Sequence, residues 1–372
     1  MTEPDHTPKF VRTLKLRVKD KHAAELSRQA RAVNFVWNYV NELSERSIRE
    51  RGRFLSAYDL HAYTTGASRE LGLHSHTVQR VNAAYVQARV QFKKRRLAWR
   101  KSGGARRSLG WVPFNTGHAK WKNGQVFFGG THFNVWTCGY TPSDYTFKSG
   151  SFSEDSRGRW YFNVAVEVEA KPSSGTSAVG IDLGCKDAAT CSDGKVLHGR
   201  WYRREQAALG IAQRARKKDR VKAIHAKVKN RRKDAHHKES TRLVRENGAV
   251  FVGSVSPKAI ARTSMSKSSL DAGWAAFKTM LEYKCARAGV VYECVDERYS
   301  TQSCSCCGVI PDSSPKGRAG LGMREWTCSG CGAHHDRDIN AARNILARGL
   351  SGLAGGTHEC REGRNPFLQG GE

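Results

Sequence analysis

The sequence predicts a multidomain α/β protein, and three observations support this prediction. Strand-like and helix-like segments alternate in a regular order over the C-terminal half, four cysteines have the spacing of a zinc knuckle, and the chain is strongly basic. Of 372 residues, 63 are Lys or Arg and 34 are Asp or Glu, which leaves a formal charge of +29. So large an excess indicates a polyanionic partner such as nucleic acid, because each phosphate that a cation neutralises releases counterions.

The N-terminal half is predicted to combine a small β-barrel with helices. Residues 10–19 alternate apolar and basic side chains, as a half-buried strand does. Helical periodicity follows over about 21–48 and 75–101, and short alternating runs from 103 to 172 predict antiparallel strands. The expected domains are a wedge-like β-barrel made of 1–20 and 103–172, and an inserted helical recognition domain at 21–102.

The C-terminal half is predicted to follow the RNase H-like plan. After a linker at 171–176, an apolar strand at 178–184 carries Asp182. Further strands are predicted at 188–192, 195–199, 249–255 and 290–295, and helices at 203–246 and 270–289. The order βββ-α-β-α-β with a final helix is that of an RNase H-like domain. The expected ranges are 177–302 and 333–348 for this domain, 303–332 for an inserted zinc ribbon, and 349–372 for a flexible tail.

Two Cys-x-x-Cys pairs predict a structural zinc site formed by Cys304, Cys307, Cys328 and Cys331. Thiolates two residues apart chelate one Zn²⁺, and two such pairs close a tetrahedral site without an open position. Disulfides are the alternative. Cys306 lies between two of these ligands and is expected to be a bystander.

The remaining cysteines and the N-terminus indicate a reducing compartment. Seven of the 11 cysteines show no pairing pattern: Cys138, Cys185, Cys191, Cys285, Cys294, Cys306 and Cys360. Residues 1–13 are polar and charged, unlike a signal peptide, and no apolar run approaches the roughly 20 residues that span a bilayer. We therefore expect a soluble, cytoplasmic protein.

Two aspartates are candidates for a catalytic metal site. Asp182 lies inside an apolar strand, where an unpaired carboxylate is costly, so it should bind a cation or an arginine. Asp338 lies at the start of the final helix, directly after the cysteine pairs. Carboxylates that bridge two Mg²⁺ about 4 Å apart are what a two-metal nuclease requires. The alternatives are a structural ion pair for Asp182 and a helix N-cap for Asp338.

Four segments of the chain resemble the TnpB family: 180–184, 304–308, 326–332 and 336–346. This family consists of transposon-encoded, RNA-guided nucleases related to type V CRISPR effectors, and the resemblance covers nearly the whole chain. It implies a RuvC-type nuclease domain, a guide RNA from the transposon end, a short motif beside the target and Mg²⁺-dependent cleavage of double-stranded DNA. It also implies catalytic roles for Asp182 and Asp338, with Asp336 as second choice.

The resemblance breaks at Gly253, which stands where the family has the catalytic glutamate of its second motif. The next strand should lie parallel to this one and about 4.8 Å away. Glu297, just beyond the end of that strand, is therefore the expected replacement, because glycine leaves space across which a long side chain can reach. Asp296, Glu282 and Glu293 are further candidates.

Two functions remain open after this comparison. In the first, Asp182, Glu297 and Asp338 hold two Mg²⁺ and the protein is an RNA-guided DNA endonuclease. In the second, the protein no longer cleaves and represses transcription as an RNA-guided DNA-binding protein derived from TnpB. A guide-independent DNA-binding accessory of transposition is a third possibility. The retained aspartates and zinc ligands favour the nuclease.

Basic clusters are expected to contact the phosphates of the guide–target duplex. They occur at the end of the second helix, in the long basic helix and beside Asp338. The predicted contacts are Lys93, Lys94, Arg95, Arg96, Arg214, Arg216, Lys217, Lys218, Arg231, Arg232, Lys233 and Arg337. Most of Trp111, Trp121 and Trp136 are expected in the core, with base stacking as the alternative. The expected setting is a prokaryotic nucleoid, and the sequence leaves monomer or dimer open.

Overall fold

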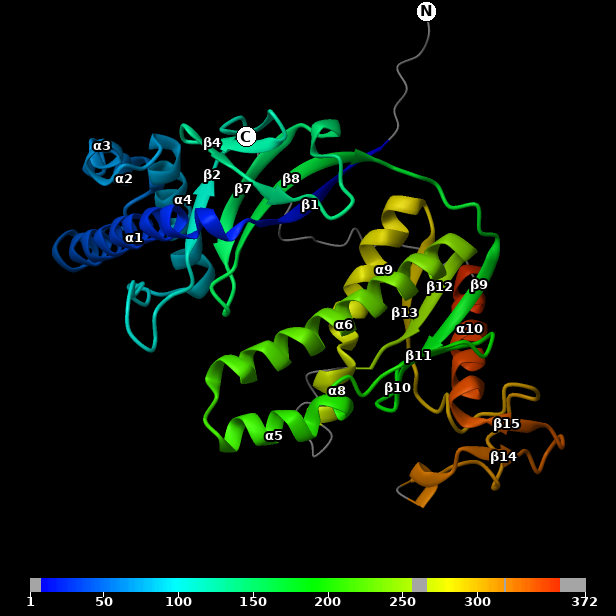
Figure 1. Ribbon diagram of the computed structural model, residues 1–372. Helices are drawn as coiled ribbons and strands as arrows, with labels where there is room; N and C mark the ends of the chain where they lie inside the picture. The colour runs from blue at the N-terminus through cyan, green and yellow to red at the C-terminus, as the bar shows by residue number, and fades with distance from the viewer. Residues whose placement is uncertain (1–7, 256–265, 318, 355–372) are drawn as a thin grey trace, which may run out of the picture. The chain divides into compact units, whose positions relative to one another are not determined.

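The computed structural model describes residues 8–255, 266–317 and 319–354 (Figure 1). The chain divides into two units, Met1–Glu169 and Ala170–Glu372, just before the linker expected at 171–176. Within the described ranges, no helix is long and apolar enough to cross a membrane.

The first unit contains two antiparallel sheets that share one core. Five strands pair in the order β2-β7-β8-β1-β6; they are β1 (Lys9–Val18), β2 (Trp111–Phe114), β6 (Val135–Trp136), β7 (Phe147–Glu154) and β8 (Trp160–Glu169). A separate meander comprises β3 (Ala119–Lys122), β4 (Gln125–Phe128) and β5 (Thr131–Phe133). Both sheets bury phenylalanines in the common core, among them Phe114, Phe128, Phe133 and Phe152.

In the described residues, the strands of the predicted β-barrel pair as two separate sheets. Among the described residues, β2 and β6 are free edges of the larger sheet, and β3–β5 pair only with one another. Two tight turns, Asn123–Gly124 and Gly129–Gly130, connect the strands of the meander. All four turn residues have positive φ, which reverses the chain direction at each turn. Alternating sequence patterns predict strands, but they do not predict which strands pair.

Four α-helices complete the described part of the first unit. They are α1 (Ala23–Arg51), α2 (Ala57–Tyr63), α3 (Ala67–Leu71) and α4 (Ser75–Phe92), and their apolar faces bury Val33, Val40, Leu60, Val81 and Tyr85. The second predicted helix is wrong at its end, because α4 stops at Phe92 and Lys93 adopts a left-handed φ of 51°.

Residues 93–101 instead form a non-helical segment that asparagines of α1 hold in place. Asn41 Nδ2 donates to the Leu97 carbonyl at 2.8 Å, and Asn41 Oδ1 accepts the Leu97 N–H at 3.0 Å. Asn38 makes the same pair of contacts with Arg100, at 2.9 and 2.8 Å. These side chains satisfy backbone groups that a helix would have satisfied internally.

The second unit is built on a mixed sheet in the order β11-β10-β9-β12-β13. β9 (Ser177–Asp182), β10 (Asp187–Cys191) and β11 (Val196–His198) are antiparallel, whereas β12 (Asn247–Gly253) and β13 (Val291–Val295) run parallel to β9. This element order agrees with the RNase H-like plan. The carboxyl ends of the three parallel strands meet at one edge of the sheet.

Helices cover both faces of this sheet (Figure 1). α6 (Lys218–Glu246) and α9 (Trp274–Ala288) pack on one face, with Leu243, Phe277 and Leu281 in the core. α10 (Arg337–Ala354) packs on the other face. A Cβ atom at Gly180 would collide with the Ala342 carbonyl oxygen, so glycine in β9 is what permits α10 to approach the strand this closely.

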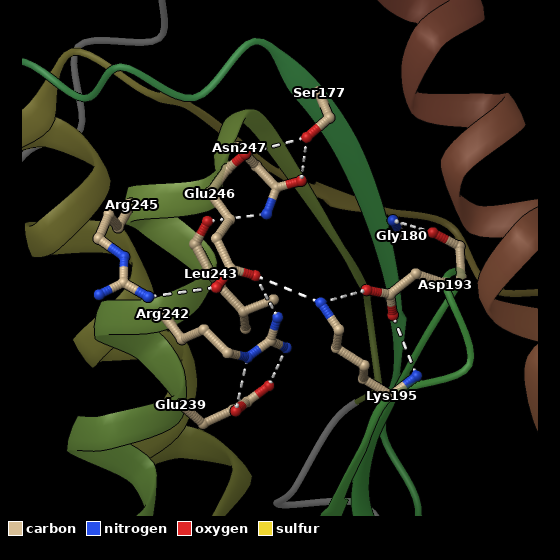
Figure 2. A network of polar contacts seen from close by, with 11 residues as sticks. Ser177, Gly180, Asp193, Lys195, Glu239, Arg242, Leu243, Arg245, Glu246 and Asn247 are labelled. Carbon is tan, nitrogen blue, oxygen red and sulfur yellow. Dashed lines mark hydrogen bonds and ion pairs between the residues drawn. The ribbon is translucent and has the colours of Figure 1, made fainter.

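The predicted basic helix at 203–246 is two helices, α5 (Gln206–Arg214) and α6, separated at Arg216, whose φ is 52°. α8 (Ser266–Ala272) precedes α9. Figure 2 shows how the end of α6 is fixed to the sheet. Arg242 binds Glu239 at 2.5 Å and Glu246 at 2.6 Å, and Lys195 of the β10–β11 turn binds Glu246 at 3.4 Å.

The chain between β13 and α10 forms the small ribbon that contains β14 (Glu325–Thr327) and β15 (His334–Asp336), with Trp326 buried beside Cys304 and Cys328. The tail expected at 349–372 is wrong at its start, because α10 continues to Ala354. Gly349 packs so closely on Phe251 that any Cβ would collide with the ring. Glycine at 349 permits close packing of α10 on β12 and does not mark a flexible tail. Residues 355–372 lie outside the described part of the chain.

Candidate active site and zinc centre

The four predicted zinc ligands lie together, and their sulfur atoms are all within 4.8 Å of one another. Sγ–Sγ distances are 3.7 Å for Cys304–Cys331 and 3.8 Å for Cys307–Cys328. Zn–S bonds of about 2.3 Å in a tetrahedron place the sulfurs about 3.8 Å apart, whereas a disulfide requires about 2.05 Å. The donor set therefore fits Zn²⁺, and the disulfide alternative is wrong.

The other described cysteines are free thiols, as the sequence predicts, and Cys360 lies outside the described residues. Cys306 is exposed and is not part of the sulfur cluster. It is therefore a bystander between two ligands.

His335 links the zinc centre to the start of α10. Its ring is buried against Trp326, with ring centroids 4.8 Å apart, and its Nε2 lies 3.0 Å from Cys304 Sγ. A hydrogen bond to a metal-binding sulfur orients that ligand. His335 directly precedes Asp336, so a single residue connects the sulfur cluster with the start of α10. No metal-ligand spacing in the sequence marks this histidine.

Asp336 is the N-cap of α10. Its Oδ1 accepts the N–H groups of Asp338 at 2.9 Å and Ile339 at 2.8 Å. The N-cap interpretation of Asp338 is therefore wrong, because the neighbouring aspartate has that role.

Three carboxylates come together at the carboxyl edge of the sheet. Asp182 ends β9, Glu297 follows β13, and Asp338 lies in the first turn of α10. Burial raises the pKa of Asp182 to about 7, and the charges of Asp338 and Glu297 add to the rise, while Arg337 opposes it. Both the burial of this charge and its repulsion by the other two carboxylates would be offset by a bound cation.

Glu297 occupies the space that Gly253 leaves empty. A Cβ atom built on Gly253 would lie 2.5 Å from Glu297 Oε2 and 3.5 Å from Glu297 Cβ. β12 and β13 are paired in parallel with Gly253 opposite Val295, so Glu297 emerges just beyond this pair. The carboxylate of Glu297, just after β13, thereby lies beside the position in β12 where Gly253 has no side chain.

The alternative carboxylates are placed differently. Asp296 is exposed and its Oδ1 accepts the Arg298 N–H at 3.1 Å, while Glu282 is exposed on α9. Glu293 is partly buried, with Oε2 lacking a hydrogen-bond partner in the described structure. None of the three is among the groups that shift the pKa of Asp182.

Two arginines hold Asp338. Arg324 Nη1 donates to Oδ2 at 2.9 Å, and Arg337 Nε donates to Oδ1 at 3.0 Å. Among the described residues, only the four cysteines form a group with all ligand atoms within 4.8 Å, so the three carboxylates are more widely spaced than that. A pair of ions about 4 Å apart requires a wider ring of ligands than one ion does.

The sequence did not identify Arg324 or Lys278 as part of this site. Lys278 of α9 donates to the Gly253 carbonyl at 2.6 Å, and its charge lowers the pKa of Glu297 against the rise that burial causes. Neither residue belongs to a recognisable motif, because the ribbon and the helix packing bring them to the site. No spacing rule applied to the sequence would have found them.

Most of the predicted phosphate contacts are exposed. A cavity of about 490 Å³ is lined by three of them, Lys93, Lys94 and Arg95, and by Phe54, Arg89 and Val90. The aromatic ring of Phe54 rests on the Arg89 guanidinium, 4.8 Å from the ring centroid, and the residue is 53% exposed. Arg96 differs from its neighbours, because Glu42 and Glu45 bind it at 3.6 and 3.3 Å.

In the second unit, five predicted cations are exposed and have no ion-pair partner among the described residues: Arg214, Arg216, Lys217, Lys218 and Lys233. Arg231 is bound to Glu205 at 2.9 Å. Arg232 donates to the carbonyls of Leu270 and Asp271, both at 3.0 Å, and so connects α6 with α8. Phosphate binding does not fit Arg232, since its guanidinium is engaged.

The tryptophans divide between core and surface. Trp111 and Trp121 pack against buried clusters of the first unit, as expected for most of the set. Trp136 is 56% exposed, with Lys19 Nζ 5.2 Å from its ring centroid.

Comparison with known proteins agrees with this architecture. Residues 274–345 match the family model "Cas12f1-like, TNB domain", and residues 161–263 match OrfB_IS605, "Probable transposase". A solved complex of Cas12f1 with sgRNA and target DNA contains a chain that aligns with a TM-score of 0.57 and 13% identity, over 91% of this chain and 99% of that one. This likeness shows a shared fold.

Two sequence relatives identify the family. A mimivirus protein of Acanthamoeba polyphaga, "TnpB-like protein L79", is 30% identical over 35% of this chain and 25% of its own. A Streptomyces pristinaespiralis protein, "Putative RNA-guided DNA endonuclease", is 33% identical over 93% of this chain and 90% of its own. A match of that identity along nearly both whole chains shows that this protein belongs to the TnpB family.

Proposed function

We propose that this protein is an RNA-guided DNA endonuclease of transposon origin that cuts DNA beside a short target-adjacent motif. The proposed catalytic residues are Asp182, Glu297 and Asp338. The observation that carries the proposal is the position of Glu297 Oε2, 2.5 Å from where a side chain at Gly253 would begin. The carboxylate missing from β12 is thereby matched by one from the neighbouring strand.

The three carboxylates suit Mg²⁺, which prefers oxygen ligands. Two such ions, when bound, activate water and stabilise the leaving oxygen in phosphodiester hydrolysis. The chain's own contribution is to collect the ligands: Asp182 is fixed by β9, Asp338 by the capped first turn of α10, and Glu297 by its position over Gly253. Arg324 and Arg337 form ion pairs with Asp338, both at 2.9 Å.

The proposed partners are a guide RNA from the transposon end and double-stranded target DNA. The exposed cations proposed to contact phosphates are Lys93, Lys94, Arg95, Arg214, Arg216, Lys217, Lys218 and Lys233. Four thiolates would hold a structural Zn²⁺, and the sheet-rich and helical parts of the first unit would form the wedge-like and recognition domains. We place the protein in the prokaryotic cytoplasm, on the nucleoid.

Gly253 favours a second candidate, a catalytically inactive, RNA-guided repressor that binds DNA and blocks transcription. Such a protein needs the guide and the target but not the third carboxylate. The two functions differ in one measurable property, which is cleavage of a bound target.

The test is cleavage of a motif-bearing DNA by the guide-loaded protein in Mg²⁺ and in Mn²⁺. We expect the wild type to cut, and Asp182→Ala and Glu297→Ala each to lower the rate at least about 100-fold while leaving target binding intact. Glu282→Ala is the matched control, since it removes an exposed carboxylate of α9 and should cut normally.

A wild type that binds target but never cuts would establish the repressor and exclude the nuclease. If the wild type cuts and Glu297→Ala cuts equally fast, the nuclease stands but the third carboxylate is another residue.

A further inference from the structure

Lys278 reaches the carboxyl end of β12 from α9. Its Nζ donates to the carbonyl oxygens of Gly253 at 2.6 Å and Val255 at 3.3 Å. The residue is partly buried, and an ammonium group withdrawn from water must replace its lost hydrogen bonds. The two carbonyls use two of its three donors.

Glu297 reaches the same residues from the end of β13. Its Oε2 lies 2.5 Å from the Cβ position of Gly253, and the Val255 backbone, like the charge of Lys278, lowers the pKa of its carboxyl against the rise that burial causes. Lys278 provides the opposite charge, and Asp296 a like charge, at this carboxylate. The two side chains therefore converge on residues 253–255 from different elements.

Anchoring of α9 does not by itself account for this lysine. The helix already packs on the sheet through Phe277 and Leu281, which are buried, and Trp274 Nε1 donates to the Gly184 carbonyl at 3.0 Å. An apolar residue at 278 would cover the same surface without the cost of burying a charge. The charge is explained if it acts on Glu297.

We infer that Lys278 is a positioning residue that holds the carboxylate of Glu297 over Gly253 and directed toward Asp182. The inference rests on the proposed function. A glutamate growing from β12 itself would be fixed by its strand and would need no such partner. Glu297 follows the end of β13, and its side chain extends toward the neighbouring strand β12. Its orientation therefore depends on the contacts that it makes at the end of β12.

The test is a double-mutant comparison in the guide-loaded protein. Lys278→Met should lower the cleavage rate about 10- to 100-fold at saturating target, because misplacing a catalytic group by about 1 Å has an effect of that size. Target affinity should not change, and Lys278→Arg should restore part of the rate. The same Lys278→Met change is then made in a protein that carries Gly253→Glu with Glu297→Ala.

In that swapped protein the carboxylate grows from β12. Removing Glu297 clears the Cβ position at 253, where the remaining close neighbour is Ile345 Cδ1 at 3.2 Å. We expect Lys278→Met to change the rate of the swapped protein less than about threefold, since the residues no longer interact. If the swapped protein does not cut, Glu297→Asp replaces it as the second background, and non-additive losses are expected.

The possible results of this comparison lead to different conclusions about Lys278. Equal or additive losses in both backgrounds would show that Lys278 only supports β12, and a wild-type rate in Lys278→Met would remove any role. Either result overturns the inference and leaves the nuclease intact. A wild type that never cuts would overturn the proposed function, and this inference with it.

Discussion

The fold raises the pKa of Asp182 from its ordinary value of 3.8 to about 7, because burial and the charges of Asp338 and Glu297 disfavour ionisation. The folded state then holds this proton more tightly than the unfolded state. Without metal, folding stability should fall as pH rises from about 4 through about 7, by on the order of 4 kcal/mol at 1.36 kcal/mol per unit. Above that range this group adds no further loss.

Unfolding by urea at pH 5 and pH 8, with metal removed, measures this effect in wild type and Asp182→Asn. Relative to the variant, the wild type should be more stable at pH 5 than at pH 8. Mg²⁺ added at pH 8 should stabilise the wild type and have little effect on the variant. Identical pH dependence in the two proteins would contradict the assignment.

At the scale of single residues, the sequence predicted the carboxylates but not the groups that hold them. The position of Glu297 beside Gly253 could be predicted, because parallel strands end at one edge of the sheet and glycine leaves room there. The sequence could not predict that Asp336 is the N-cap, because two aspartates two residues apart look alike in sequence. It also could not predict the hydrogen bond from Arg324 to Asp338. Only the direction of each side chain separates a cap from a metal ligand.

At the scale of elements, the segment 93–101 shows why a helix boundary was mispredicted. Its periodicity continues that of α4, yet Lys93 ends the helix and asparagines of α1 provide the partners for the following backbone. Asn41 is fully buried, and both its amide atoms bind Leu97. The contacts come from residues more than fifty positions earlier, which a local pattern cannot contain.

Asn41→Ala should therefore destabilise the first unit by about 2–4 kcal/mol, since it leaves a buried N–H and a buried carbonyl without partners. Chemical denaturation of the purified protein measures the loss. Asn230→Ala, an exposed change on α6, is the control and should stay within about 0.5 kcal/mol of wild type. An equally small effect of Asn41→Ala would mean that the segment is not held by this side chain.

The cavity formed by α4 and the segment after it should bind single-stranded nucleic acid through stacking and charge. Phe54→Ala should weaken binding of a short single-stranded RNA or DNA by about 5- to 100-fold, which corresponds to about 1–3 kcal/mol per stacked base. Phe35→Ala removes another exposed ring, which does not line the cavity, and should have no such effect. Fluorescence anisotropy gives the affinities, and equal effects of the two changes would contradict the prediction.

At the scale of the second unit, the zinc ribbon is inserted between two parts of one site. Glu297 lies before the ribbon and Asp338 after it. The ribbon returns to α10 through the Arg324 carbonyl, which accepts the Arg337 N–H at 2.7 Å, and through His335 at the sulfur cluster. The sequence predicted the insertion from cysteine spacing. It could not predict that the ribbon also contacts Asp338 through Arg324, because that contact depends on the folded path of the chain.

Removing zinc should therefore abolish cleavage as well as unfold the ribbon. Metal analysis should find one Zn²⁺ per chain, and chelation should lower the cleavage rate in proportion to the zinc lost, because structural zinc contributes on the order of 10 kcal/mol to such small sites. Added Zn²⁺ should restore cutting and added Mg²⁺ alone should not. Cys328→Ser should behave like the chelated protein, whereas Cys306→Ser, which changes an exposed thiol outside the cluster, should keep both zinc and activity. Normal cleavage by a zinc-free protein would show that Asp338 is held without the ribbon.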